Sequence, residues 1–214
     1  MNRREFSLLA GTAGLGLVVT QGAQAQGAPV EGTNYVKLAQ PLPVTPTGKV
    51  EVVEFFWYGC PHCFALEPTL EQWVKSVPAD VNFRRVPASF TPLYEFHQKL
   101  FYALEVLGQQ PAMHRKVFNY IHLEHKPLTK DADVLTFATA NGLDGAKLVE
   151  TMKSFSVQTK SRQAKALAEG YRIDGVPALG VQGRFYTSVA MAGGPEKTFA
   201  VTDYLIGVAR KSPH

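Results

Sequence analysis

The only two cysteines of this 214-residue chain, Cys60 and Cys63, are separated by Pro61 and His62 in the stretch "EFFWYGCPHCFALEP". Such a pair suits three kinds of chemistry: a structural disulfide, part of a metal site, or reversible thiol–disulfide exchange. A structural disulfide gains most from closing a long loop, and this very short loop contributes little closure entropy. The spacing therefore favours a redox-active pair, and a passive disulfide stays open as the weaker alternative.

A metal site would need more ligands than the two cysteines supply, because structural zinc takes about four. His122 and His125, near the end of a predicted helix, could ligate a metal, but such a pair lacks the further ligands that a site needs. Covalent haem attachment requires a histidine directly after the second cysteine, where this chain has Phe64. The other histidines that could act as metal ligands are His62, His97 and His114. We expect neither a metal nor a cofactor.

The position of the first cysteine predicts its acidity. A strand that ends at Gly59 and leads directly into a helix places the sulfur of Cys60 among the unpaired N–H groups of the helix start. These groups favour a thiolate, and the imidazole of His62 favours it further. Pro61 removes a donor that the first turn would leave unpaired, and it stiffens the motif. We therefore expect Cys60 to be an exposed nucleophile of lowered pKa and Cys63 to be covered by the helix, a couple that oxidises other thiols.

The elements around the motif follow from hydrophobic periodicity. "VEVVEFFWY" (50–58) is typical of a buried strand, and residues 60–77 have apolar residues at helical spacing, with Pro68 expected to kink the helix. The remaining predictions are a strand at 81–86, helices at 92–107, 112–124, 131–140 and about 145–169, strands at 178–181 and 184–188 that form a hairpin, and a closing helix at 195–210. An α/β domain interrupted by a helical insertion accounts for this order of elements.

Glu54 lies in the predicted strand among Val and Phe residues, two steps from Phe56 on the same face. A carboxylate buried beneath the cysteines would have a raised pKa. The alternative is a carboxylate that faces solvent at the edge of a strand, because isolated buried carboxylates are costly.

Residues 1–25 have the organisation of a cleaved export signal. Arginines at positions 3 and 4 precede an apolar run at 6–19 and a small-x-small sequence at 23–25. The run is shorter than the roughly 18 residues of a membrane span. "RREF" is similar to a twin-arginine motif, and both that route and the general secretory route stay open. The mature chain would begin near Gln26 in an oxidising compartment, where disulfides persist.

The net charge gives no indication of a nucleic-acid partner. The formal charge is +4, and loss of the signal, with its two arginines and one glutamate, leaves +3. This surplus is spread along the chain rather than collected in a stripe. About 190 mature residues suit one domain with an inserted subdomain.

The motif "FFWYGCPHC" (55–63), followed over a hundred residues later by "GVPA" (175–178), resembles the DsbA family of periplasmic thiol:disulfide oxidoreductases in the thioredoxin superfamily. The resemblance covers essentially the whole mature chain. It implies an α/β, thioredoxin-like fold interrupted by an all-helical insertion. The thioredoxin-like domain would comprise residues 26–90 and 165–214, with the helical insertion at 91–164.

The resemblance also implies roles for single residues. Cys60 would be the attacking cysteine and Cys63 the resolving one. Pro177 would be a cis-proline that presents the backbone of Val176 to a substrate chain, whereas the alternative is an ordinary trans proline in a turn. Glu54 would exchange a proton with Cys63.

A further feature follows from the same resemblance. Arg85 takes the position of a lysine that is common in the family; because arginine stays charged, it could tune the electrostatics of Glu54 but could not carry a proton itself. Apart from the resemblance, the aromatic residues around the site indicate that Phe64 and the helices from Pro92 onward could frame an apolar groove for unfolded chains, although individual groove residues are not assigned.

The implied function is donation of the Cys60–Cys63 disulfide to thiols of exported proteins in the periplasm, through a mixed disulfide at Cys60. The implied partners are these substrates and a DsbB-like inner-membrane protein that reoxidises the enzyme, and the expected state is a monomer. A reductase or isomerase of the DsbC and DsbG kind is an alternative, but the short segment before Lys49 leaves no room for their N-terminal dimerisation domain. A non-catalytic chaperone or metal carrier on the same fold is the third interpretation.

Overall fold

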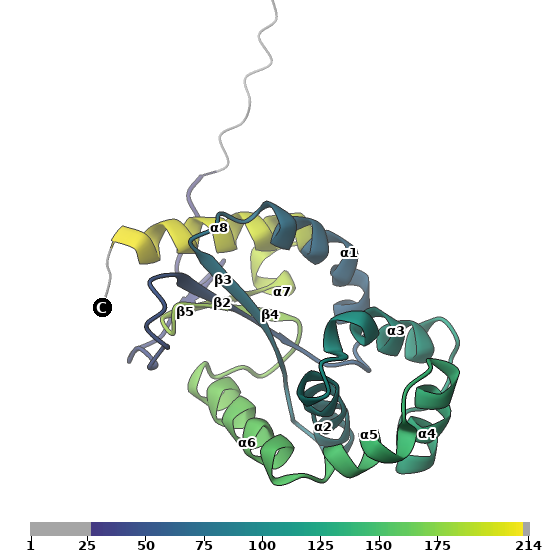
Figure 1. Ribbon diagram of the computed structural model, residues 1–214. Coiled ribbons are helices and arrows are strands. Elements are labelled where there is room, and N and C mark those ends of the chain that lie inside the picture. Colours follow the sequence, from purple (N-terminus) through teal and green to yellow (C-terminus); the bar gives the residue numbers. More distant parts are fainter. Residues whose placement is uncertain (1–26, 212–214) are drawn as a thin grey trace, which may run out of the picture.

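The computed structural model describes residues 27–211 (Figure 1), so the predicted export signal at 1–25 lies outside the described residues. No helix within this range is both long and apolar enough to cross a membrane. In chain order the elements are β1 (Val36–Lys37), β2 (Val50–Phe56), α1 (Pro61–Ser76), β3 (Val81–Pro87), α2 (Pro92–Val106), α3 (Gln110–His122), α4 (Asp131–Ala140), α5 (Gly145–Met152), α6 (Phe155–Gly170), β4 (Ala178–Val181), β5 (Phe185–Ser188), α7 (Val189–Ala192) and α8 (Pro195–Lys211). The short strand β1 and the short helix α7 were not predicted from the sequence.

The strands form one mixed sheet in the order β1-β5-β4-β2-β3. Strand β2 is an interior strand, parallel to the edge strand β3 and antiparallel to the middle strand β4. Successive side chains of a strand point to opposite faces, so Val52 and Glu54 share one face and Val53 and Phe55 the other. Because helices cover both faces, β2 is buried along almost its whole length and has few polar residues.

The two faces of the sheet carry separate hydrophobic clusters. Helices α1 and α8 lie on one face (Figure 1), where Val52, Leu70 and Leu205 belong to one buried cluster. On the other face, Val53 and Tyr171, the residue after α6, belong to a second cluster that continues into the helices α2 to α6. The end of β2 therefore lies where the sheet meets the helical insertion.

The helical insertion between β3 and β4 contains five helices rather than the four predicted. The segment predicted as one helix at about 145–169 is divided into α5 and α6. Ser154 interrupts it, because its hydroxyl accepts a hydrogen bond from the N–H of Val157 and caps the start of α6. The predicted boundary between residues 164 and 165 falls within α6, and the subdomain division remains a prediction.

The local sequence explains where α1 begins. Cys60 is its N-cap, with its sulfur 3.3 Å from the backbone nitrogen of Cys63, and Pro61 occupies the first helical position. Pro68 lies inside α1, where it removes one main-chain hydrogen bond, and the helix continues to Ser76. The sequence thus places a sulfur, rather than the usual oxygen, at the start of the helix.

Candidate active site

Two segments that are far apart in the sequence meet at the cysteines. Cys60 follows β2, and the Val176–Pro177 peptide bond, which is cis, precedes β4. Because β2 and β4 are antiparallel neighbours, the end of β2 lies beside the start of β4. Sγ of Cys60 lies 3.6 Å from the carbonyl oxygen of Val176, to which it donates a hydrogen bond when it is protonated. The predicted cis-proline is confirmed, and the structure brings it to the first cysteine.

The sulfur of Cys60 is surrounded by groups that stabilise its thiolate. The thiol of Cys63 donates to it, the backbone N–H groups of Cys63 and His62 do the same, and the charge of His62 adds to their effect. Together they lower the pKa of Cys60 to about 6 despite its burial. The prediction of an exposed sulfur is wrong, because Cys60 is only 6% exposed and the loop of Val176 contacts it.

Cys63 has the opposite character. It lies one turn into α1 with no exposed surface. Burial raises its pKa, and the hydrogen bond to Cys60 and the charge of the Cys60 thiolate raise it further. Both cysteines are free in this structure. In the reduced protein the proton therefore stays on Cys63 while Cys60 is ionised.

Glu54 is fully buried on the interior strand β2, so the alternative of a solvent-facing carboxylate is wrong. Its register partner on β3 is Arg85, whose Nε lies 3.1 Å from Glu54 Oε2. The two groups attract each other, but neither oxygen of Glu54 has a hydrogen-bond partner among the described residues. Burial is the main reason why the pKa of Glu54 is raised to about 8; the charge of Glu67 adds to the shift and Arg85 opposes it.

A second buried carboxylate, Glu67 of α1, lies beside the first and was not singled out in the sequence. Its Oε2 is 3.1 Å from Arg85 Nη2, and its Oε1 is 3.1 Å from Nε2 of His114 on α3. Burial alone would raise the pKa of Glu67, but these hydrogen bonds and charges outweigh it and lower the pKa. One signal could have found Glu67: it lies on the same helical face as the buried Cys63 and Leu70.

Helix α3 contributes two histidines that the sequence analysis considered only as metal ligands. Nδ1 of His114 is 3.1 Å from the Tyr58 hydroxyl, and Nε2 of His122 is 2.8 Å from the Tyr58 carbonyl oxygen. The ring of His122 also stacks on Phe64, with centroids 4.8 Å apart. Within residues 27–211 no group of three or more His, Cys, Asp or Glu side chains is placed to hold a metal ion. These histidines attach the helical insertion to the segment that carries the cysteines.

A cavity of about 520 Å³ opens beside the cysteines. It lies between His62, the turn that contains Val176 and Pro177, and the segment from Tyr186 to Met191. Neither Phe64 nor the helices from Pro92 onward line this cavity; Phe64 packs against α3, and a groove framed by these elements stays a prediction. Most of its lining side chains are apolar, and the exposed backbone of the cis-proline loop forms one wall.

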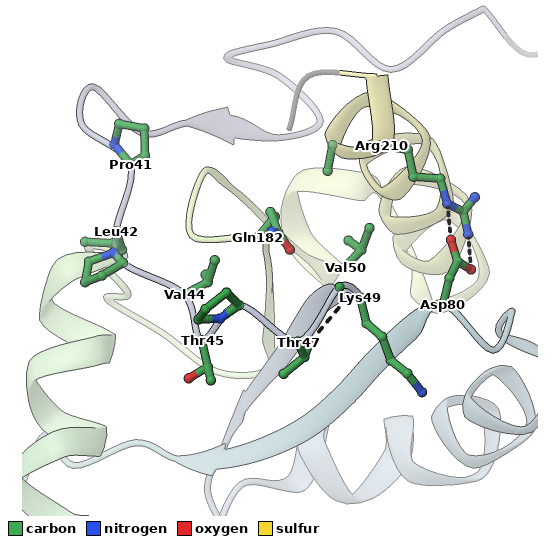
Figure 2. A pocket seen from close by; sticks show the side chains of 14 residues that line it. Pro41, Leu42, Val44, Thr45, Thr47, Lys49, Val50, Asp80, Gln182 and Arg210 are labelled. Carbon is green, nitrogen blue, oxygen red and sulfur yellow. Dashed lines mark hydrogen bonds and ion pairs between the residues drawn. The ribbon is translucent and has the colours of Figure 1, made fainter. Parts of the chain in front are cut away.

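A larger cavity of about 800 Å³ is remote from this chemistry (Figure 2). It lies at the start of β2, beneath the proline-rich segment 41–49, and Figure 2 shows the Arg210–Asp80 ion pair at its edge. Strand β2 separates it from the cysteines by roughly 20 Å, at about 3.3 Å per residue. Its size therefore does not make it the active site.

The mixed sheet, the helix that starts at a CxxC pair and the facing cis-proline define a thiol:disulfide oxidoreductase of the thioredoxin fold. The sequence model described as a DSBA-like thioredoxin domain matches residues 87–205. The thiol:disulfide interchange protein DsbA of Pseudomonas aeruginosa is 43% identical over 175 residues, which are 82% of this chain and 83% of that protein. The DsbA of Azotobacter vinelandii is 41% identical over 207 residues, 96% of each chain. The chain belongs to the DsbA family.

Solved structures agree with this assignment. The crystal structure of P. aeruginosa DsbA superposes with a TM-score of 0.80 at 43% identity, covering 84% of this chain and 94% of the other. The oxidoreductase DsbA of Xylella fastidiosa gives a TM-score of 0.80 at 31% identity, covering 86% and 99%. The thioredoxin-like fold with its helical insertion is thus shared, and the protein is a thiol:disulfide oxidoreductase.

Proposed function

We propose that this protein is a dithiol oxidase that donates its Cys60–Cys63 disulfide to thiols of exported proteins. The observation that supports this direction is the hydrogen bonding at the Cys60 sulfur, which lowers its pKa to about 6. A stabilised thiolate favours the reduced enzyme, so the disulfide is readily given up. The leader-like sequence at 1–25 supports export to the periplasm.

The exchange proceeds in two displacements. A substrate thiolate attacks Cys60 Sγ; a bond forms between the two sulfurs, the Cys60–Cys63 bond breaks, and Cys63 leaves with the electron pair. Because the pKa of Cys63 is raised by burial, its sulfur takes a proton, which Glu54 supplies. A second substrate thiolate then attacks the substrate sulfur of the mixed disulfide and expels the Cys60 thiolate. The substrate loses two electrons and the enzyme gains them.

The remaining site residues hold the substrate and set the acidity. The backbone of Val176, before Pro177, offers hydrogen bonds to an extended substrate chain, and the 520 Å³ cavity receives an apolar side chain next to the reacting cysteine. Pro61 and His62 hold the first turn of α1 and stabilise the thiolate. The enzyme acts as a monomer, and a DsbB-like quinone-linked protein of the inner membrane reoxidises Cys60 and Cys63.

The direction is tested by equilibrating the protein anaerobically with mixtures of reduced and oxidised glutathione. Trapping with an alkylating reagent and mass spectrometry give the fraction of Cys60–Cys63 disulfide. We expect the disulfide to form only when oxidised glutathione is in large excess, as for an oxidant of other thiols. A pair that is already oxidised in predominantly reduced glutathione would contradict the proposal and identify a reductase.

A further inference from the structure

The buried His114 of α3 belongs to the charged cluster beneath the cysteines. It is 4% exposed, and each ring nitrogen has a partner 3.1 Å away: Nε2 faces Glu67 Oε1 and Nδ1 faces the Tyr58 hydroxyl. A carboxylate can only accept, so Nε2 carries the hydrogen directed at Glu67, and Nδ1 accepts from Tyr58. One neutral form of His114 therefore satisfies both contacts.

Arg85 divides its donors between two buried carboxylates. Its Nη2 forms a 3.1 Å hydrogen bond with Glu67 Oε2, whereas its Nε lies 3.1 Å from Glu54 Oε2 without hydrogen-bond geometry. A guanidinium binds a carboxylate most strongly through two parallel N–H donors, and neither glutamate has that arrangement. The difference lies in their other contacts: His114 donates a hydrogen bond to Glu67, whereas the only contact of this kind at Glu54 among the described residues is the ion pair with Arg85 Nε.

We propose that His114 is a positioning residue for disulfide exchange: by holding Glu67 against Arg85, it keeps Arg85 from closing onto Glu54. The inference rests on the proposed role of Glu54 as the proton donor and acceptor for Cys63. A Glu54 that received two N–H bonds from Arg85 would be held ionised at neutral pH and would have no proton to give. His114 has no contact with either cysteine, so it acts only through Glu67.

The surrounding charges leave one route for this effect. Glu54 faces Glu67 of α1, Arg85 of β3, the Tyr58 hydroxyl and the two cysteines. His114 faces Glu67, Arg85, the Tyr58 hydroxyl and Glu71 of α1. Glu71 is directed to Arg115 on α3, 3.6 Å away, and Tyr58 is neutral because burial raises its pKa well above the usual value. The charged groups common to both sets are Glu67 and Arg85.

The test is the titration of Glu54 itself, followed by carbon NMR of reduced protein labelled at glutamate carboxyl groups, with Glu54→Gln identifying the signal. We expect His114→Leu to lower the Glu54 midpoint from about 8 by about one pH unit or more. His114→Gln, which can still present an N–H to Glu67, should keep most of the original midpoint. In the Glu67→Gln background, His114→Leu should cause no further shift.

The matched control is His97→Leu. His97 is another buried histidine of the helical insertion, with its Nε2 2.7 Å from the carbonyl oxygen of Leu128 and no contact with either glutamate. It should leave the Glu54 midpoint unchanged. If His114→Leu fails to fold because the Tyr58 hydroxyl loses its partner, the Tyr58→Phe, His114→Leu double variant removes both polar groups and is titrated instead.

The outcomes separate this inference from the proposed function. An unchanged Glu54 midpoint in folded His114→Leu, or a further shift in the Glu67→Gln background, overturns the role of His114. As a second readout, the rate at which dithiothreitol opens the disulfide at pH 7 should fall in His114→Leu in proportion to the loss of protonated Glu54. If His114→Leu lowers the Glu54 midpoint but leaves the rate unchanged, His114 has no role in disulfide exchange. If the rate is also unchanged in Glu54→Gln, it is the proposed role of Glu54 as proton donor that fails.

Discussion

Cys60 and Cys63 differ in acidity because of where each lies on the helix. The first is the N-cap of α1 and accepts hydrogen bonds from the donors around it, and the second lies within the helix with no exposed surface. The burial of Cys63 keeps its proton in place and lets its thiol donate to Cys60. The Cys60 thiolate is therefore the nucleophile of the reduced protein, and the Cys63 thiol stabilises it by donating a hydrogen bond.

Alkylation of the reduced protein by iodoacetamide should follow a midpoint near pH 6 and should modify Cys60 alone, because only its thiolate is stabilised. Rates measured between pH 4 and 9, with the modified residue identified by mass spectrometry, test this. Cys63→Ala removes the largest stabilising contact and should raise the midpoint. A midpoint near that of a free cysteine, about 8.5, in the unaltered protein would contradict the assignment.

At the scale of elements, the turn between β2 and α1 has no room for a side chain at Gly59. A Cβ there would lie 2.3 Å from the ring of Trp57, which itself stacks on Tyr94 of α2 with centroids 3.9 Å apart. The indole cannot yield without losing that stacking. The helical insertion therefore fixes the turn that precedes the cysteines.

Gly59→Ala should accordingly lower the free energy of unfolding by about 1–3 kcal/mol, the usual cost of overpacking. Gly207→Ala, in α8, is the control: nothing lies within 4 Å of the new methyl group, and alanine favours a helix over glycine by up to about 1 kcal/mol. Urea denaturation followed by circular dichroism measures both. Equal stability of the two variants would show that Trp57 can move aside.

Tyr171, which follows α6, connects the helical insertion to the β4–β5 turn. Its buried hydroxyl accepts the N–H of Gly183 at 2.8 Å, and its ring packs on Phe55 of β2. Tyr171→Phe keeps the ring contact but leaves that N–H without its acceptor, so we expect a loss of about 1–3 kcal/mol. The same urea measurements test this, and a loss below about 0.5 kcal/mol would mean that solvent replaces the hydroxyl.

The sequence predicted the structural features that depend on residues close together in the chain, and it missed those that depend on contacts between distant residues. The strand before the cysteines, the helix start at Cys60 and the acidity of its thiol follow from local pattern. The division of α5 from α6 depends on one serine cap, which periodicity does not detect. The contacts of Glu67 with Arg85 and His114 join three elements, and no spacing in the sequence predicts them. The cavity beside the cis-proline was not predicted either, because its walls come from three segments that are far apart in the sequence.

At the scale of the whole molecule, the stability of the fold depends on the redox state of the cysteines. The folded protein stabilises the Cys60 thiolate and lowers its pKa from the ordinary value of about 8.5 to about 6. Between these values the unfolded reduced chain binds a proton that the folded chain does not, so the stability of the reduced form rises with pH. The oxidised form has no thiol and lacks this dependence.

We therefore expect reduced protein to gain stability over oxidised protein as the pH rises from about 6 to about 8.5, and to lose that gain as the pH falls back through 6. Urea midpoints of both forms at pH 5, 7 and 9 measure the difference. Protein alkylated at Cys60 serves as the control and should show no such gain. A difference that is constant between pH 5 and 9 would contradict the stabilised thiolate.

The pairing of Cys60 with the carbonyl of Val176 joins residues 116 positions apart in the sequence. Strand β4, which follows that carbonyl, has to take its place beside β2 before the contact exists. While the helical insertion is being synthesised, the chain already contains both cysteines but does not yet contain the loop of Val176 that contacts Cys60. The site is therefore complete only after β4 has been synthesised and paired with β2, and a chain that stops within the helical insertion lacks the contact between Cys60 and Val176.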